Sequence, residues 1–94
     1  MEEKAKNIAE LLKILANEHR LLILCALGKG PLTVGEIHAF TPNISASALS
    51  QHLNQLRTAG ILASEKQGMN VIYRIQDQRV TALLGTIKQY YCGN

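Results

Sequence analysis

Two thiols are the side chains best suited to covalent chemistry in this 94-residue chain. Cys25 lies inside the apolar run Leu21–Leu27, and Cys92 lies two residues before the end of the sequence. Two thiols can be joined by oxidation or by exchange with a sulfur electrophile when the fold brings them together. A cysteine in an apolar run is more often a small buried hydrophobic residue with little reactivity. The residues alone favour that structural role and leave a regulated thiol pair open.

Metal-binding and catalytic clusters are not evident around these thiols. Zinc takes about four nitrogen, sulfur or oxygen ligands, whereas His19, His38 and His52 lie in three separate predicted elements. We expect His52 to be a boundary residue that hydrogen-bonds to the backbone. The chain has no Ser-His-Asp spacing and no phosphate-binding loop. The sequence therefore predicts a protein that is not an enzyme and that has no metal and no cofactor.

A second set of candidate residues lines one side of the helix predicted over residues 46–59. At 100° per residue, Leu49, Leu53 and Leu56 fall within about 60° of each other and face the core. The opposite side carries short hydrogen-bonding side chains, and residues 37–64 contain no Asp or Glu. Such a face suits the major groove of DNA, where Gln bonds adenine bidentately and Ser bonds bases or phosphates. We expect Ser47 and Gln51 to contact bases, with Asn54 as a further candidate.

Phosphate contacts are expected from the ends of this helix and from the hairpin that follows it. A helix N-terminus favours anions, and cations on a hairpin can reach the neighbouring minor groove or its phosphates. For the helix, the alternative is that its polar side is only that of an ordinary surface helix. For the hairpin, the alternative is that Gly68 only makes the turn and that Lys66 and Arg74 are solvated. The full set of predicted DNA-contacting residues is Ser45, Ser47, Ser50, Gln51, Asn54, Arg57, Lys66 and Arg74.

Five helices and one hairpin are needed to position these residues. Helix caps are expected at Asn17, Thr33 with Glu36, Ser45 and Asp77. The second helix is apolar all round, which predicts that it is central and buried. The expected elements are helices over 3–16, 18–27, 34–40 and 46–59, strands over 61–66 and 71–75, and a final helix after residue 77. This mainly α chain with a small β-hairpin, in the order α-α-α-α-β-β-α, is typical of a winged helix-turn-helix domain spanning residues 1–94.

The composition is that of an ordinary globular chain, with 47% hydrophobic and 18% charged residues. The net charge of +3 gives mild support to a polyanionic partner. The sequence has no secretory signal and no run of about 20 apolar residues, so we expect no membrane partner and a cytoplasmic location. A reducing compartment disfavours a permanent structural disulfide.

A homodimer is expected because a chain this short has a thin core. The first and last helices carry apolar stripes, and pairing of two chains across a twofold axis would bury them. Such a dimer would place its two recognition helices about one DNA turn apart and would favour an inverted-repeat operator. The alternative is that both helices simply pack on the second helix. The predicted interface residues are Leu11, Leu15, Leu83, Leu84, Ile87 and Tyr91.

Three segments carry a resemblance to the ArsR/SmtB-type repressors. Residues 15–24, LANEHRLLIL, resemble the family's "LADPTRLRIL" opening, and residues 45–62, SASALSQHLNQLRTAGIL, resemble its recognition helix. Residues 68–75 resemble its "G-x-x-x-Y-x-L" wing. The resemblance implies a homodimeric winged-helix repressor that an inducer releases from operator DNA.

The inducer sites of that family differ from one branch to another. The arsenic type carries Cys-x-Cys in the third helix, but residues 34–37 here contain no thiol. The zinc type uses acidic and histidine ligands on the last helix, which here has Asp77 before it but no His and no Glu. Cys25 and Cys92 match the positions of the two cysteines in the sulfide-responsive, biofilm-associated branch. That resemblance implies that reactive sulfur species join the cysteines, by a disulfide or polysulfide bridge, and that DNA binding is then lost.

Two other hypotheses stay open from the sequence. The chain is then either a repressor with another inducer and structural cysteines, or a winged-helix protein-interaction module that no longer binds DNA. The acid-free helix face and the positive net charge argue against the module. DNA binding that weakens with salt would separate the two classes.

Overall fold

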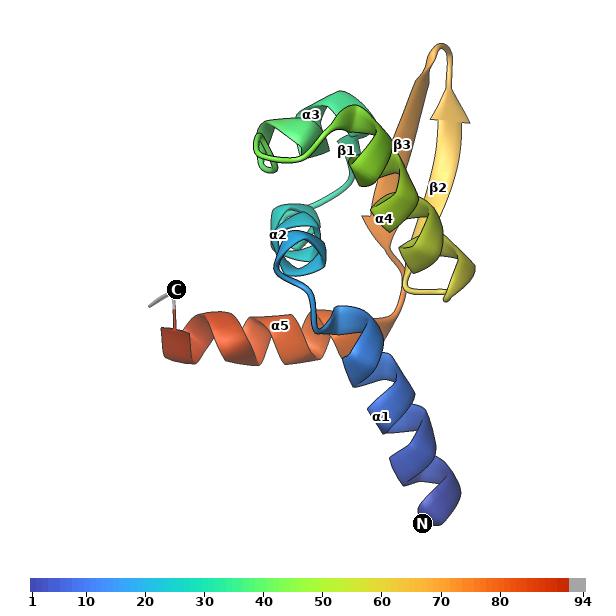
Figure 1. Ribbon diagram of the computed structural model, residues 1–94, viewed down its shortest axis with the longest axis vertical. Coiled ribbons are helices and arrows are strands. Elements are labelled where there is room, and N and C mark those ends of the chain that lie inside the picture. Colours follow the sequence, from blue (N-terminus) through green and yellow to red (C-terminus); the bar gives the residue numbers. More distant parts are fainter. Residues whose placement is uncertain (92–94) are drawn as a thin grey trace.

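Five helices and three short strands make up the described part of the chain, which in this computed structural model is residues 1–91, the last of them without its side chain (Figure 1). The helices are α1 (Glu2–Leu15), α2 (Glu18–Leu27), α3 (Val34–Ala39), α4 (Ala46–Thr58) and α5 (Gln78–Tyr91), and the strands are β1 (Leu32–Thr33), β2 (Leu62–Gln67) and β3 (Asn70–Ile75). Every element that the sequence predicts is present, with bounds that differ by about one residue.

The sheet has three strands rather than the two of the predicted hairpin. The strand order is β1-β3-β2 and both pairings are antiparallel, with Leu32 opposite Tyr73 and Thr33 opposite Ile72. β1 is only two residues long, which is too short to show the alternation that marks a strand. Its second residue, Thr33, also caps α3, so the capping signal hides the strand signal.

Side-chain caps begin the helices that carry the functional residues. The side chain of Asn17 accepts hydrogen bonds from the backbone of His19 and Arg20 at 3.0 and 3.1 Å. Thr33 and Glu36 form the predicted capping box, and Ser45 Oγ accepts from the Ala48 backbone at 3.0 Å. Each such cap stabilises its helix by about 1 kcal/mol, and together they fix where α2, α3 and α4 begin.

The core is built mainly from leucines and isoleucines, which come from all five helices and from the sheet. Its fully buried members include Ile23, Leu24, Ile37, Leu49 and Val80. The prediction that α2 is buried all round is wrong at two positions, because Leu21 and Leu22 are 36% and 47% exposed. The elements of one chain enclose only part of the α2 surface, so the remaining apolar side chains face outward.

Two helices extend beyond this core. Figure 1 shows the N-terminal half of α1 and the C-terminal half of α5 projecting from the body in different directions. The radius of gyration is 13.5 Å, against roughly 12 Å for a typical domain of this length. Among residues 1–91, no helix has the length and apolar character that crossing a bilayer requires.

Candidate nucleic-acid interface and thiol site

The helix-turn-helix is formed by α3, the turn that follows it and α4. His38 Nε2 donates a hydrogen bond to the Ile44 carbonyl at 2.9 Å, which ties α3 to the segment just before α4. Thr41 in this turn is buried, and its hydroxyl lies 3.5 Å from the Ile37 carbonyl oxygen. With Leu49, Leu53 and Leu56 in the core, these contacts fix both the direction and the rotation of α4.

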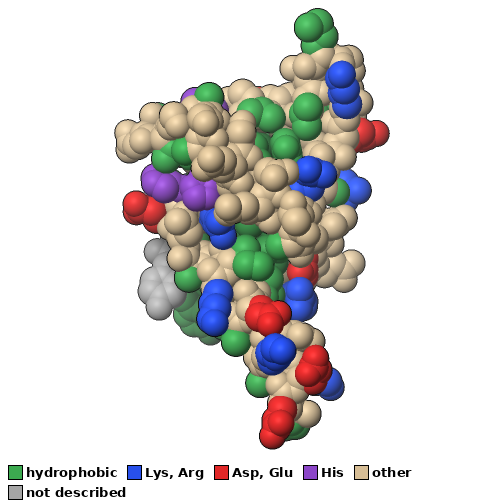
Figure 2. All heavy atoms as spheres, turned by 45° about the vertical axis from the view of Figure 1, so that its right-hand side comes forward, with side chains coloured by type: hydrophobic (Ala, Val, Ile, Leu, Met, Phe, Trp, Pro, Cys, Tyr) green, Lys and Arg blue, Asp and Glu red, His purple; other side chains and the backbone are tan. Residues whose placement is uncertain are grey.

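The outward face of α4 is the candidate base-reading surface. Ser47, Gln51, Asn54 and Thr58 are all exposed, as the helical spacing predicts. Arg57 Nη2 donates to Asn54 Oδ1 at 2.8 Å, so the amide group of Asn54 is the part left to donate to a ligand. In Figure 2 this side of the molecule is mostly uncharged and polar, and acidic side chains gather mainly at the lower end, over α1. The face can therefore approach phosphates without strong like-charge repulsion.

Both ends of α4 carry groups that suit phosphate. Ser45 and Ser50 are exposed, and the Ser45 hydroxyl sits at the helix N-terminus, where backbone N–H groups and the helix dipole favour an anion. Arg57 is exposed in the last turn. The predicted phosphate-contacting residues of this helix are therefore accessible, on the same side of the molecule as the base-reading face or at its ends.

The two cations predicted to contact DNA from the wing do not lie together. The register pairs Lys66 with Val71 and Arg74 with Ala63, so the two side chains project from opposite faces of the hairpin. Lys66 is one pair from the turn, and Arg74 lies about 10 Å nearer the base. Arg74 there lines a hollow of about 340 Å³ that also contains Lys29 and Thr81. Of these two cations, only Lys66 lies near the tip of the wing.

A polar cluster joins α2 to the recognition helix. Arg20 Nε donates to Nδ1 of His52 at 3.2 Å, Nη1 donates to the Ile14 carbonyl at 3.0 Å, and Nη2 donates to Gln55 Oε1. The prediction that His52 bonds to the backbone is wrong, since its partner is the Arg20 side chain. Burial, and then the charges of Arg20 and His19, lower the pKa of His52. His52 is therefore a neutral acceptor that holds α4 to α2.

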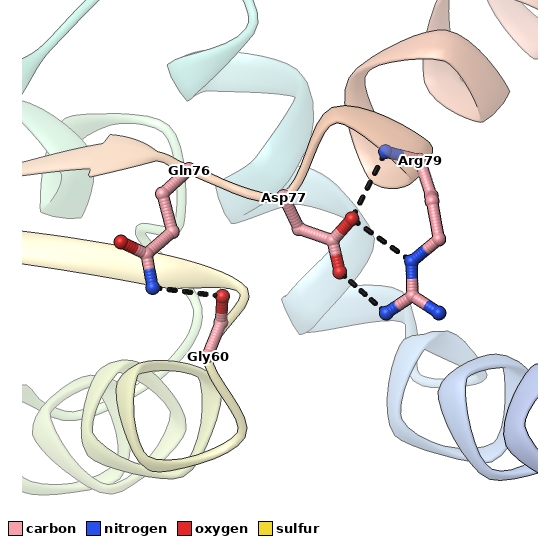
Figure 3. A network of polar contacts seen from close by, with 4 residues as sticks. All are labelled: Gly60, Gln76, Asp77 and Arg79. Carbon is pink, nitrogen blue, oxygen red and sulfur yellow. Dashed lines mark hydrogen bonds and ion pairs between the residues drawn. The ribbon is translucent and has the colours of Figure 1, made fainter.

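A second polar contact joins the end of α4 to the start of α5 (Figure 3). Gln76 Nε2 donates to the Gly60 carbonyl at 3.0 Å, across the junction that precedes α5. Beside it, Asp77 caps α5 by accepting from the Arg79 backbone at 2.9 Å, as predicted. The Arg79 guanidinium also binds both carboxylate oxygens, at 3.1 and 2.7 Å, and lowers the pKa of Asp77. This carboxylate is thus engaged by Arg79 rather than presented as a metal ligand.

Cys25 lies at the rim of a small hollow between α2 and α5. The residue is half-buried, and the hollow of about 210 Å³ is lined by Leu22, Cys25, Ala26, Lys29, Phe40 and Lys88. Lys88 of α5 donates from Nζ to the Cys25 carbonyl at 3.2 Å. Cys92 lies outside the described residues, directly after the last residue of α5. Within residues 1–91 no group of three His, Cys, Asp or Glu side chains is arranged to hold a metal ion.

Comparison with known proteins identifies the family. The family model for bacterial regulatory proteins of the arsR family matches residues 17–64, from the α2 cap into β2. The chain belongs to the arsR family. It is 39% identical over 93 residues to the HTH-type transcriptional regulator YgaV of Escherichia coli K12, and the match covers 98% of this chain and 93% of that protein. It is 35% identical over 92 residues to the biofilm growth-associated repressor of Agrobacterium fabrum, with 98% and 78% covered.

Solved structures of arsR-family relatives share the fold. HlyU from Vibrio cholerae, a transcriptional activator, superposes with a TM-score of 0.90 at 39% identity, covering 98% of this chain and 99% of that one. Reduced HlyU gives a TM-score of 0.85 at 40% identity over the same shares. This chain is therefore a DNA-binding transcriptional regulator with a winged helix-turn-helix fold, and its relatives are not enzymes. Because one relative is an activator and another a repressor, family membership leaves the direction of regulation open.

The predicted interface residues of this arsR-family chain fall into two groups. Leu11, Leu15 and Leu84 are buried within the single chain, so they have little surface left for a partner. Leu83 is half-buried and Ile87 is 38% exposed, while the Tyr91 side chain lies outside the described residues. Among the described side chains of these two helices, the large apolar ones that remain exposed are Ile8, Leu12, Ile87 and Tyr90.

Sequence reasoning did not single out Arg20, Lys29 or Lys88 as functional residues. Arg20 begins a strongly apolar helix, where a cation is easily taken for a solvated first-turn residue. Its three partners lie on α1 and α4, and such contacts have no local signal. Lys88 is the cation nearest to Cys92 in the sequence, but its contact with Cys25 spans 63 residues.

Proposed function

We propose that this arsR-family regulator is a repressor, and that it leaves its operator when reactive sulfur or oxidising species link Cys25 to Cys92. One observation carries the proposal: α5 reaches the Cys25 turn of α2, since Lys88 Nζ lies 3.2 Å from the Cys25 carbonyl oxygen. Cys92 is only four residues beyond Lys88 in the sequence. Likeness to a biofilm growth-associated repressor and to a relative solved in its reduced form supports the same conclusion.

The linking chemistry balances with an organic persulfide as the only other reactant. The Cys25 thiolate attacks the outer sulfur of RS–SH, which forms Cys25–S–SH and releases RS⁻. The Cys92 thiolate then attacks Cys25 Sγ, which forms the disulfide and releases HS⁻. Each cysteine sulfur loses one electron, and each of the two persulfide sulfurs gains one, so that they leave as RS⁻ and HS⁻. A disulfide needs Cα atoms roughly 4.4–6.8 Å apart, and a longer sulfur chain relaxes that limit.

Loss of DNA binding would follow from how α4 is held. Cys25 lies in α2, and Cys92 follows α5 in the sequence. Arg20 of α2 is bonded to His52 of α4, and Gln76, just before α5, is bonded to Gly60, just after α4. A covalent tether between α2 and the residues that follow α5 would pull on both helices, and α4 is bonded to α2 and to the segment before α5. A shift of about 1 Å in a bonded element is enough to spoil positioned hydrogen bonds to base edges.

The DNA-contacting unit in this proposal is a homodimer on an inverted-repeat operator. The exposed apolar side chains of α1 and α5 exceed what one chain can cover, and a twofold pairing would bury them. The arrangement of α4 supports base contacts by Ser47, Gln51 and Asn54. Phosphate contacts are assigned to Ser45, Ser50, Arg57 and Lys66, and a weaker one to Arg74, which lies at the base of the wing.

The test is the affinity of reduced protein for DNA from its own upstream region, before and after polysulfide treatment. We expect the untreated protein to bind and the treated protein to dissociate, with recovery after a thiol reductant. Cys92→Ser and Cys25→Ser should each bind DNA like the unmodified chain and resist release. Release that persists in Cys92→Ser would rule out the two-cysteine mechanism and favour a repressor with another inducer and a structural Cys25.

The direction of regulation needs a separate measurement. A reporter placed under the upstream promoter should rise when the regulator is deleted, and should rise in the wild-type strain on polysulfide treatment. A reporter that falls on deletion would make this chain an activator, as the relative HlyU is named.

A further inference from the structure

The hollow beside Cys25 combines a cysteine with cationic and apolar residues in its lining. Its lining includes Leu22 and Phe40, two large hydrophobic residues that are 47% and 51% exposed. The lining also includes two lysines, Lys29 after α2 and Lys88 of α5. None of the described residues that line the hollow is acidic. A cysteine, two lysines and apolar residues thus line one hollow.

Lys88 is held in position by two contacts with the end of α2. Its ammonium group donates to the Cys25 carbonyl at 3.2 Å, near the C-terminus of α2, where the helix dipole favours a cation. It also packs over Gly28, since a Cβ at that position would lie 3.3 Å from Lys88 Nζ. Because Gly28 has no side chain, nothing on that residue crowds the Lys88 ammonium group beside the Cys25 turn.

We infer that Lys29 and Lys88 select an anionic sulfur donor, a persulfide or polysulfide, for attack by Cys25. This inference rests on the proposed role of Cys25 as the sulfur-reactive thiol. Cations beside a reactive site raise the local concentration of an anion and compensate the charge that moves between sulfur atoms during transfer. The leaving group is a thiolate, which the same ammonium groups stabilise. Neutral oxidants such as hydrogen peroxide gain nothing from these charges on approach.

The hollow is a small depression that is open to solvent and not an enclosed cavity. At about 210 Å³ it is smaller than the roughly 300–1,000 Å³ of a pocket for a drug-sized ligand. It therefore admits an inorganic polysulfide or the reactive end of a longer organic persulfide, whose carbon chain can lie on Leu22 and Phe40. With an inorganic polysulfide, Cys25 attacks the sulfur next to the end of the chain, which forms Cys25–S–S–SH and releases the shortened polysulfide, and the lysines bind the charges of the donor. With an organic persulfide, Cys25 attacks the outer sulfur of RS–SH, and the lysines stabilise the RS⁻ that leaves.

The test measures the rate of Cys25 modification in a Cys92→Ser background, by mass spectrometry, so that one thiol is followed without any DNA readout. Lys29→Gln, Lys88→Gln and the double variant are compared with Lys29→Arg, Lys88→Arg and Lys6→Gln, a matched charge change on α1 away from the hollow. The donors are inorganic tetrasulfide and glutathione persulfide, in separate arms, and the neutral reagent is iodoacetamide. Thermal unfolding followed by circular dichroism establishes that each variant is folded.

We expect each Lys→Gln change to slow both anionic donors by about two- to fivefold, and the double variant to slow them further. The Arg variants and Lys6→Gln should react like the parent. Raising the salt concentration should slow the modification of Cys25 by both donors in the parent protein, and should not change its rate in the double variant. Slowing of tetrasulfide alone would restrict the inference to inorganic polysulfide.

Two results would overturn the inference about the lysines. The first is that the Lys→Gln variants react with both donors as fast as the parent does. The second is that these variants lose as much rate with iodoacetamide as with the donors, which would mean that the lysines only shape the surroundings of the thiol. Failure of the proposed function would give a different result. The protein with both cysteines would stay on DNA after complete modification, while the Lys→Gln changes would still slow the modification of Cys25.

Discussion

Gln51 lies at the middle of the exposed face of α4, where a side chain can meet a base edge without disturbing the core. We expect Gln51→Ala to weaken binding to the operator by about 1–3 kcal/mol and to relax the preference at one base position. Fluorescence anisotropy against a set of single-base operator variants measures both effects. Gln78→Ala, a matched change at an exposed position on α5, should leave them unaltered. An unchanged base preference in Gln51→Ala would remove this residue from base reading.

Lys66 and Arg74 make a matched pair for the wing, because they carry the same charge on opposite faces of one hairpin. We expect Lys66→Gln to reduce the slope of log affinity against log salt by about 0.9 for each phosphate that is no longer neutralised, hence by roughly 2 for a dimer. Arg74→Gln should change the slope less, since Arg74 lies at the base beside Lys29. Equal changes would mean that DNA reaches both faces of the wing.

Among the elements, α2 and α4 are coupled by a contact that depends on pH. The pKa of His52 is lowered in the folded chain, by burial first and then by Arg20 and His19. The unfolded chain, with the ordinary value of 6.5, then binds the proton more readily. The stability from this contact is therefore fully present above pH 6.5 and is lost as the pH falls through the folded-state pKa.

Urea unfolding at about pH 7.5 and at about pH 5.5, on either side of the ordinary histidine pKa, tests this coupling. We expect the free energy of unfolding to fall on acidification in the wild type. His52→Asn keeps an acceptor for Arg20 but does not titrate, so its free energy of unfolding should fall less. Parallel pH profiles for the two proteins would show that His52 is not the group that titrates.

The elements were predictable where their signals are local, and the contacts between them were not. Caps at Asn17, Thr33 and Ser45 fix helix starts from neighbouring residues alone, so the predicted bounds agree with the structure. The partner of His52 lies 32 residues away, and no spacing in the sequence indicates it. Likewise, register rather than composition separates Lys66 from Arg74. The exposed face of α4 was predictable because helical periodicity and an acid-free stretch both mark it.

At the scale of the whole molecule, an apolar stripe indicates that a helix face is covered but not by which chain. Leu11 and Leu84 are covered by their own chain, which leaves Leu12 as a sharper probe of the proposed dimer. Leu12 is 47% exposed, so Leu12→Glu should leave the protomer folded and shift the mass in sedimentation equilibrium from dimer to monomer. Met69→Glu, on the wing tip and 97% exposed, should stay dimeric. A Leu12→Glu protein that still sediments as a dimer would place the interface elsewhere.

The division of α4 into a buried leucine face and an outward polar face has a consequence for how such regulators diversify. The side chains that would choose an operator contribute little to folding, and the contacts that would report on the thiols leave from other sides of the same helix. Exchanging the outward residues for those of a relative should therefore give this chain the operator specificity of the relative and leave its own response to an inducer unchanged. The DNA specificity of one scaffold can in this way change by successive substitutions, and each intermediate protein stays folded.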